Sequence, residues 1–195
     1  MSVMSDEARA VRVLTVTISD QRKRFADEAG KRLDQELTTA GFTVVRHVVL
    51  ADEPGFIREL VRSTATDNEA DAIVLTGGTG ITPRDQTYEA LEELYEKHIE
   101  GFGEAFRRIT FDSLGPRAMF WRASAGTFNK CPIFSLPGNV QAVVLGVRQL
   151  LAPTLVHAVA MAMGRETHTI GPASGSSSPS LPSAAPSSSS LSGAK

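Results

Sequence analysis

The sequence predicts an α/β fold in which helices cover both faces of a parallel sheet. Between residues 11 and 75, three apolar segments rich in β-branched residues alternate with two amphipathic helical segments. Strands and helices that alternate in this order are joined by right-handed crossovers, so the strands lie parallel. Small and acidic residues follow each predicted strand, and ligands of such folds bind beyond the carboxyl ends of the strands.

One domain of ordinary size accounts for most of the chain, which has 195 residues. Residues 1–10 are predicted to form a flexible polar lead, and residues 11–165 have the length of a single domain. Residues 166–195 are rich in Ser, Pro and Ala. This tail is predicted to be disordered, because it carries too little apolar surface to offset the entropy lost on ordering.

The bulk composition excludes several classes of function. The formal net charge is −2 and the basic residues form no long stripe, which argues against nucleic acid as a partner. Cys131 is the only cysteine, which excludes an intrachain disulfide framework and a multi-cysteine zinc site. No apolar run resembles a signal peptide or is long enough to span a bilayer. We therefore expect a soluble, cytoplasmic protein with no membrane partner.

The first half of the domain is predicted to follow the order strand, helix, strand, helix, strand. Alternation of β-branched residues favours the strands, and apolar residues spaced four apart favour the helices. Gly41 is expected to end the first helix, and Pro54 to begin the second. The five elements are residues 11–17, residues 26–40, residues 42–50, a helix from near residue 54, and residues 72–75.

The second half of the domain is predicted to contain four helices and two strands. One helix is expected to begin at Gly101, with Phe102 and Phe106 on its packing face. The last helix is largely apolar, so we expect it to be buried. The other ranges are residues 87–97 for a helix, 118–127 and 132–136 for strands, and 140–150 and 152–163 for the final helices.

The most informative motif is the glycine-rich run Thr76-Gly77-Gly78-Thr79-Gly80, which directly follows a predicted strand. Glycines leave backbone N–H groups unscreened, so such a loop can approach a phosphate or a flat ring closely. Arg84 and Asp85 bring a cation and a carboxylate to the same place. The pattern indicates phosphoryl or nucleotidyl chemistry, and a plain turn between strand and helix is the alternative.

A second turn rich in small residues, Ser135-Leu136-Pro137-Gly138-Asn139, follows the last predicted strand and precedes a helix. Backbone N–H groups at the start of a helix favour a negatively charged group. Taken alone, Pro-Gly before a helix is common turn chemistry. Together with the glycine-rich run, the segment predicts two subsites, one for each of two anionic substrates.

Acidic residues follow the first three predicted strands, at Ser19-Asp20, at Asp52-Glu53 and at Asp85. The carboxyl ends of parallel strands meet at one edge, so we expect these carboxylates to share one rim of the sheet. Asp52 and Asp85 are the expected ligands of Mg²⁺, which prefers one or two carboxylates together with substrate phosphate oxygens. The alternatives are helix capping for Asp52, and helix capping or an ion pair with Arg84 for Asp85. Arg84 is expected either to hold a phosphate or to be exposed.

Two further residues that could carry chemistry are expected to be structural. His47 lies within the second predicted strand. Cys131 has no neighbouring base in the sequence, which favours a buried thiol over a nucleophile.

Several motifs occur in order along the predicted domain: Ser19-Asp20, Asp52-Glu53, Thr76 to Gly80, Arg84-Asp85 with Thr87 and Glu89-Ala90, Gly101 to Glu104, and Leu136-Pro137-Gly138. Together they resemble the molybdopterin adenylyltransferase family of molybdenum cofactor biosynthesis, the MogA/MoaB group, over roughly residues 11–163. Three features depart from the common pattern of that family. No glycine follows Ser19-Asp20, Tyr88 stands at a position where proline is common, and Trp121 stands where serine is frequent.

The resemblance implies a three-layer α/β/α molybdopterin-binding fold with a mostly parallel sheet, assembled as a homotrimer or homohexamer. Active members transfer AMP from ATP to the terminal phosphate of molybdopterin with Mg²⁺ and release pyrophosphate. The molybdenum insertion enzyme is an expected partner. A non-catalytic molybdopterin-binding or carrier protein of the MoaB type is the alternative, and another nucleotide-dependent reaction on the same fold is a third.

The resemblance also assigns roles to residues. Asp52 and Asp85 are the implied catalytic and metal-binding residues. The implied substrate- and nucleotide-binding residues are Ser19, Asp20, Thr76, Gly77, Gly78, Thr79, Gly80, Arg84, Thr87, Glu89, Ser135, Pro137, Gly138 and Asn139.

Overall fold

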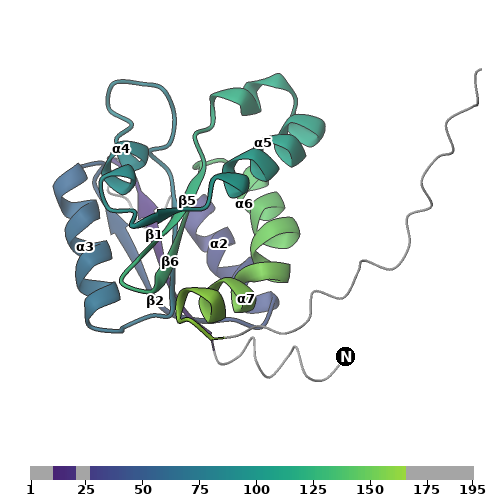
Figure 1. The fold of residues 1–195 in the computed structure, drawn as a ribbon. Coiled ribbons are helices and arrows are strands. Elements are labelled where there is room, and N and C mark those ends of the chain that lie inside the picture. Colours follow the sequence, from purple (N-terminus) through teal and green to yellow (C-terminus); the bar gives the residue numbers. More distant parts are fainter. Residues whose placement is uncertain (1–10, 21–26, 166–195) are drawn as a thin grey trace, which may run out of the picture.

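The structure is a computed structural model that describes residues 11–20 and 27–165. The lead predicted over residues 1–10 and the tail predicted over residues 166–195 lie outside the described residues, so both remain predictions. Within the described part, the alternation of strands and helices matches the sequence pattern closely, and the predicted α/β class is confirmed (Figure 1).

A six-stranded sheet forms the centre of the domain, in the order β2-β1-β3-β6-β5-β4. The first four of these strands are parallel, and β5 and β4 continue the sheet in antiparallel pairings. The sheet is therefore mostly parallel, as expected. The strands are β1 (Arg12–Ile18), β2 (Thr43–Leu50), β3 (Ala72–Thr76), β4 (Lys97–His98), β5 (Ser124–Phe128) and β6 (Cys131–Leu136).

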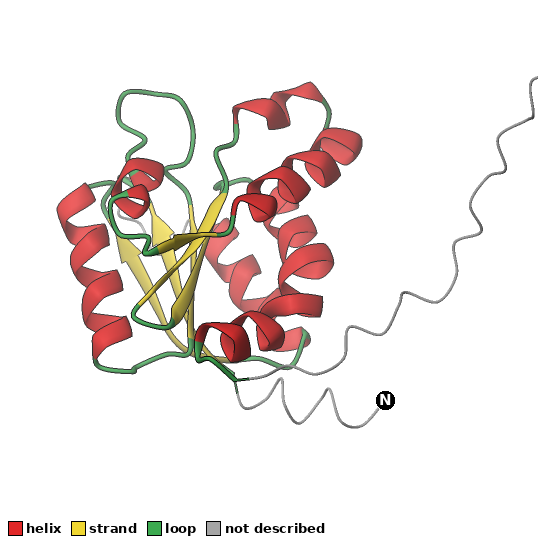
Figure 2. Cartoon of the chain, in the orientation of Figure 1, coloured by secondary structure: helices red, strands yellow, loops and turns green. Residues whose placement is uncertain are grey.

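Helices cover both faces of the sheet and make three layers (Figure 2). In Figure 1, α3 and α4 lie on one side and α2, α5, α6 and α7 lie on the other. The helical elements are α2 (Glu28–Thr39), α3 (Pro54–Thr66), α4 (Thr87–Glu92), α5 (Glu100–Leu114), the 3₁₀ helix η2 (Pro116–Phe120), α6 (Val140–Gly146), the π-helical segment η3 (Val147–Leu151) and α7 (Ala152–Ala162).

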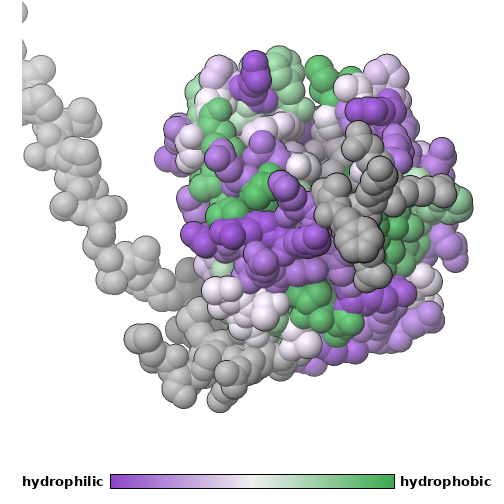
Figure 3. Space-filling view, turned by 180° about the vertical axis from the view of Figure 1, so that it is seen from behind, coloured by the Kyte–Doolittle hydropathy of each residue, from purple (hydrophilic) through white to green (hydrophobic). Residues whose placement is uncertain are grey.

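Two hydrophobic cores lie on the two faces of the sheet, and strand alternation divides residues between them. On β3, Val74 belongs to the core under α2 and α5, whereas Ile73 and Leu75 belong to the core under α3 and α4. Leu33 and Leu37 of α2 are fully buried in the first core. Burial of one such side chain contributes about 1.5–3 kcal/mol relative to exposure. The face opposite to that of Figure 1 is mostly hydrophilic, with hydrophobic residues in small patches (Figure 3).

Two predicted boundaries were wrong. The helix predicted over residues 87–97 ends at Glu92, because the chain leaves it to form the edge strand β4, where Lys97 pairs with Thr127. The strand predicted over residues 118–127 begins only at Ser124. Gly115, with a φ of +85°, stops α5 and starts the 3₁₀ helix η2 instead. The first error follows from tertiary pairing that a local pattern does not record, and the second from the turn at Gly115.

The last helix differs from the sequence expectation in two respects. Only Leu155 and Val159 of α7 are buried, and Met161 is 61% exposed, so the prediction of a buried helix holds for one face alone. By length and composition, the helical run Val140–Ala162 could cross a bilayer, which corrects the expectation that no stretch is long enough. A helix in the core of a soluble protein passes the same test, and Val147 and Leu151 of this run are fully buried in the first core.

Candidate active site

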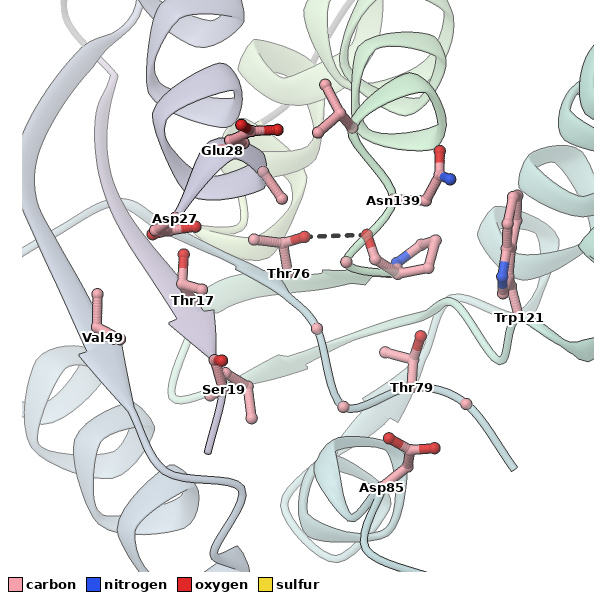
Figure 4. Close-up of a pocket in the computed structure, with 18 residues that line it drawn as sticks. Thr17, Ser19, Asp27, Glu28, Val49, Thr76, Thr79, Asp85, Trp121 and Asn139 are labelled. Carbon is pink, nitrogen blue, oxygen red and sulfur yellow. Dashed lines mark hydrogen bonds between the residues drawn. The ribbon is translucent and has the colours of Figure 1, made fainter. Parts of the chain in front are cut away.

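The carboxyl ends of β1, β3 and β6 meet around one cavity of about 640 Å³ (Figure 4). Such a volume is typical of a small-molecule site. Of the three expected acidic positions, Asp85 contributes its carboxylate to the described wall, and Ser19 lines it in place of Asp20. Asp20 and Asp85 are both close enough to Asp52 to affect its pKa, so the three carboxylates do lie near one another at this end of the sheet. The described lining residues are Thr17, Ile18, Ser19, Asp27, Glu28, Ala29, Val49, Thr76, Gly77, Gly78, Thr79, Gly80, Asp85, Trp121, Pro137, Gly138, Asn139 and Val140.

The glycine-rich loop comes so close to its neighbours that side chains would not fit. A Cβ on Gly77, whose φ is +102°, would lie 2.2 Å from the carbonyl oxygen of Ile18. A Cβ on Gly78, whose φ is +63°, would lie 2.1 Å from Oγ1 of Thr87 and 2.5 Å from Oδ2 of Asp52. These two glycines therefore allow both the left-handed backbone conformation of the loop and its close packing onto the strand ends.

The glycine-rich loop and the second turn are joined directly. Thr76 donates a hydrogen bond from Oγ1 to the carbonyl oxygen of Pro137 at 3.0 Å, as Figure 4 shows. The N–H of Gly77 also donates to the carbonyl oxygen of Leu136 at 3.0 Å. Asn139 caps α6, since its side-chain oxygen accepts from the N–H of Ala142 at 3.0 Å. The two segments predicted to form the subsites thus both line one cavity.

Asp85 lies on the rim of the cavity beside Gly80. Its Oδ2 accepts hydrogen bonds from the N–H and the Oγ1 of Thr82, at 2.9 and 2.6 Å. Both bonds use Oδ2, which leaves Oδ1 available to a ligand. The N-cap residue of α4 is Gln86, so the capping alternative for Asp85 is not found. Arg84 is exposed and is not among the described residues that line the cavity.

Asp52 lies under the glycine-rich loop instead of in the cavity wall. Its Oδ1 accepts a hydrogen bond from the N–H of Gln86 at 3.1 Å, and its own N–H donates to Asp20 at 3.2 Å. Glu53 is the N-cap residue of α3, so Asp52 does not cap that helix. Burial raises the pKa of Asp52 to about 6, the Gln86 hydrogen bond opposes this rise, and the nearby Asp85 carboxylate adds to it.

The remaining predicted residues lie around the cavity but outside its lining. Asp20 lines a neighbouring cavity of about 500 Å³ with Glu53 and Phe56. Thr87 is fully buried beneath Gly78. Ser135 is also fully buried, with its Oγ 2.9 Å from Oγ of Ser124, so its side chain cannot reach a ligand in the cavity.

Arg122 is the most important residue that sequence reasoning missed. Its Nε donates to the carbonyl oxygen of Gly80 at 2.9 Å and to that of Thr79 at 3.3 Å. Its guanidinium also forms an ion pair with Glu89 and lies 4.9 Å from the ring centre of Tyr88. Glu89, which was expected to bind substrate, is not among the described residues that line the cavity and forms this ion pair with Arg122. No local signal in the sequence links Arg122 to the loop.

A polar cluster that includes Asp27 borders the opposite wall of the cavity. Oδ1 of Asp27 accepts from the N–H of Gly30 at 2.7 Å, and its Oδ2 lies 3.0 Å from Nε2 of His47. Nδ1 of His47 lies 3.0 Å from Asp34. The hydrogen bond to Asp34 raises the pKa of His47, burial opposes the rise, and Asp27 adds to it. The structural role expected for His47 agrees with this arrangement.

The described wall of the cavity is acidic. Asp27, Glu28 and Asp85 line it, and the described lining residues include no Arg or Lys. Among the described residues, no group of three or more His, Cys, Asp or Glu side chains could hold a metal ion. A bound Mg²⁺ would therefore need phosphate oxygens of a substrate besides Asp85 and Asp52, a combination that Mg²⁺ prefers.

This arrangement defines the class of α/β proteins that bind a small molecule beyond the carboxyl ends of their strands. Residues 3–157 match the family described as "Probable molybdopterin binding domain". The chain therefore belongs to this family, in its MogA/MoaB-like group, and functions in molybdenum cofactor biosynthesis.

Relatives support this assignment over most of the chain. Molybdenum cofactor biosynthesis protein B of Bacillus subtilis (strain 168) is 36% identical over 163 residues, which cover 82% of this chain and 96% of that protein. The Escherichia coli (strain K12) protein of the same name is 34% identical over 155 residues, which cover 80% of this chain and 91% of that protein. The fold also resembles the crystal structure of MoaB from Thermus thermophilus, with a TM-score of 0.71 and 30% sequence identity. The match covers 80% of this chain and 98% of that chain.

Proposed function

We propose that this protein is a Mg²⁺-dependent molybdopterin adenylyltransferase, which transfers AMP from ATP to the terminal phosphate of molybdopterin and releases pyrophosphate. One observation carries the proposal. Two small-residue turns, from the ends of β3 and β6, are joined by the hydrogen bond from Thr76 to Pro137 and line one cavity with Asp85 on its rim. Two neighbouring anion subsites beside a carboxylate suit a reaction between two phosphorylated substrates.

The reaction needs positioning and charge stabilisation more than it needs a protein nucleophile. The terminal phosphate of molybdopterin attacks the α-phosphorus of ATP, one P–O bond forms, and the bond to the pyrophosphate leaving group breaks. The glycine-rich loop and the turn at Pro137 and Gly138 hold the two substrates side by side. The loop is kept in place by Arg122 from one side and, from the other, by the N–H of Thr87, which donates to the carbonyl oxygen of Gly78.

The charges that face the cavity support the proposal that Mg²⁺ binds at this site. The described wall carries carboxylates and no cation, so phosphate groups bound there need a positive charge from another source. Mg²⁺, when bound, would neutralise the phosphates and orient them for in-line displacement. Oδ1 of Asp85 and Oδ2 of Asp52 are the oxygens left for this role, because the other oxygen of each accepts backbone hydrogen bonds.

The test is pyrophosphate release from ATP and Mg²⁺, measured with and without molybdopterin. We expect release that depends on molybdopterin in the wild type and a loss of at least about 100-fold in Asp85→Asn. Asp67→Asn, an exposed carboxylate at the end of α3, is the matched control and should be unaffected. Molybdopterin bound by the wild type without any release would instead identify a non-catalytic binding or carrier protein.

We also propose that the protein assembles as a homotrimer or homohexamer and passes its product to the molybdenum insertion enzyme. Both proposals rest on the resemblance to the family. Sedimentation equilibrium of the full chain measures the assembly, and a monomer at micromolar concentration would contradict it. Co-sedimentation with the insertion enzyme tests the partner.

A further inference from the structure

We propose that the indole of Trp121 is the surface on which the planar nitrogen heterocycle of a phosphorylated ligand stacks. This inference rests on the proposed function, which supplies two such rings, the adenine of ATP and the pterin of molybdopterin. The phosphates of the same ligand lie toward the glycine-rich loop. Trp121 thus sets which ring is held, and at what distance from the loop.

Trp121 is the only aromatic residue among the described residues that line the cavity. In Figure 4 it stands beside Asn139 on one wall, and Val49 and Asp27 lie on the opposite wall. The residue is partly exposed, so that part of its surface is open to the cavity. The remaining lining is made of small, acidic or aliphatic residues, none of which offers a flat π surface to a ring.

The indole is held at a defined place relative to the loop. On the protein side it packs against the fully buried Phe106, with ring centres 6.5 Å apart and planes tilted by 50°. Its backbone N–H donates to the carbonyl oxygen of Ala118 at 3.1 Å. The next residue, Arg122, donates its own N–H to the carbonyl oxygen of Thr79 at 3.1 Å. The aromatic surface is therefore tied to the loop through the adjacent backbone, and such preorganisation lowers the entropic cost of binding a ring and its phosphates together.

Packing alone is the competing explanation, because Trp121 also contacts the first hydrophobic core. Packing requires volume on the Phe106 side, whereas stacking requires an aromatic face on the cavity side. Leucine fills volume without a π face, and phenylalanine supplies both. Trp121→Leu and Trp121→Phe therefore separate the two roles, and both keep an apolar side chain against Phe106.

The chain contains one tryptophan, so tryptophan fluorescence of the full-length protein reports on Trp121 alone. The experiment excites at the red edge of the indole band and titrates, in separate arms, ATP with Mg²⁺ and molybdopterin under anaerobic conditions. Pyrophosphate with Mg²⁺ is the control without a ring, and N-acetyltryptophanamide corrects for absorption by the ligands. We expect quenching by at least one ring-bearing ligand and none by pyrophosphate. The ligand that quenches the fluorescence carries the ring that stacks on Trp121.

Calorimetry then measures the Kd of the quenching ligand for the variants. We expect Trp121→Leu to weaken binding about 5- to 150-fold, and Trp121→Phe to restore most of it. Phe120→Leu, at the neighbouring exposed aromatic that does not line the cavity, is the control and should leave Kd unchanged. Circular dichroism confirms that each variant is folded.

The outcomes separate this proposal from the proposed function. If a ring-bearing ligand binds Trp121→Leu as tightly as it binds the wild type and does not quench the wild-type fluorescence, the stacking role is overturned. This outcome does not contradict the proposed adenylyl transfer. Quenching and weakened binding without pyrophosphate release would support stacking and contradict the transferase. A wild type that binds neither ligand by calorimetry would overturn both.

Discussion

Arg122 donates a hydrogen bond from its Nε to the carbonyl oxygen of Gly80 at 2.9 Å, although 42 residues separate the two in the chain. The same side chain reaches the carbonyl oxygens of Thr79 and Asp85 and forms an ion pair with Glu89. A planar guanidinium can serve several acceptors at once in a fixed geometry. A residue just before β5 thus helps to maintain the conformation of the glycine-rich loop, together with the bonds that the loop itself makes to the turn at Pro137.

Replacing this guanidinium should loosen the loop. We expect Arg122→Lys to lower the free energy of unfolding by about 1–2 kcal/mol, because an ammonium cannot reach all of the acceptors and leaves part-buried carbonyls unpaired. The Kd for ATP with Mg²⁺ should rise about tenfold. Urea denaturation and calorimetry measure the two effects. Arg117→Lys, on the exposed side of η2, is the control, and equal behaviour of the two variants would show that the loop does not depend on Arg122.

The close packing under the loop leads to a second prediction, on the stability of glycine variants. Gly78→Ala should lower the free energy of unfolding by at least about 2 kcal/mol, since its φ of +63° disfavours a side chain and its Cβ would overlap Thr87 and Asp52. Gly101→Ala in α5 meets no atom within 4 Å and should stabilise the protein by about 0.5 kcal/mol through helix propensity. Thermal unfolding of both variants checks the contrast, and a stable Gly78→Ala protein would be incompatible with the observed loop.

The raised pKa of Asp52 predicts a cost in stability at neutral pH. Its pKa in the folded protein is about 6, above the ordinary value of 3.8, so the folded state binds more protons than the unfolded state between these values. Stability should therefore fall as pH rises from about 4 to about 6. We expect Asp52→Asn to be about 1 kcal/mol more stable than the wild type at pH 8 and no more stable at pH 3.5.

Urea denaturation of wild type and Asp52→Asn across this pH range measures that difference. Glu53→Gln, at the neighbouring residue, controls for a general change of charge at the end of β2. A difference between Asp52→Asn and the wild type that does not vary with pH would show that Asp52 is not the titrating group. If Asp52 also contributes to metal binding, the more stable variant should be the less active one.

The cluster around His47 predicts a pH dependence of the same sign as that of Asp52, but at higher pH. Asp34 and Asp27 raise the pKa of His47 above its ordinary value of 6.5, so the protonated imidazolium stabilises the fold. This contribution is complete below pH 6.5 and is lost as pH rises through the raised pKa. NMR titration of the imidazole protons should show the raised pKa in the wild type and a lower pKa in Asp34→Asn. Asp67→Asn should leave the titration of His47 unchanged.

Much of the fold followed from local patterns. The valine-rich segment before Leu50, the buried strand before Thr76 and the helix that begins at Pro54 all lie where periodicity predicted them. Prediction failed where a tertiary contact overrode local preference. Tyr95 and Lys97 continue a helical pattern, yet the chain leaves α4 because Lys97 completes the sheet beside β5 and Tyr95 is buried.

The sequence by itself determined the alternation of strands and helices, and therefore that the carboxyl ends of the parallel strands would bring the loop at Gly77 and the turn at Gly138 together. These features depend on patterns within a few residues and on the handedness of crossovers. Only the tertiary structure decided that Trp121 and Arg122 belong to the same site while Ser135 is buried beneath it. Such contacts join segments tens of residues apart, and no local periodicity encodes which side chain completes a cavity formed by distant parts of the chain.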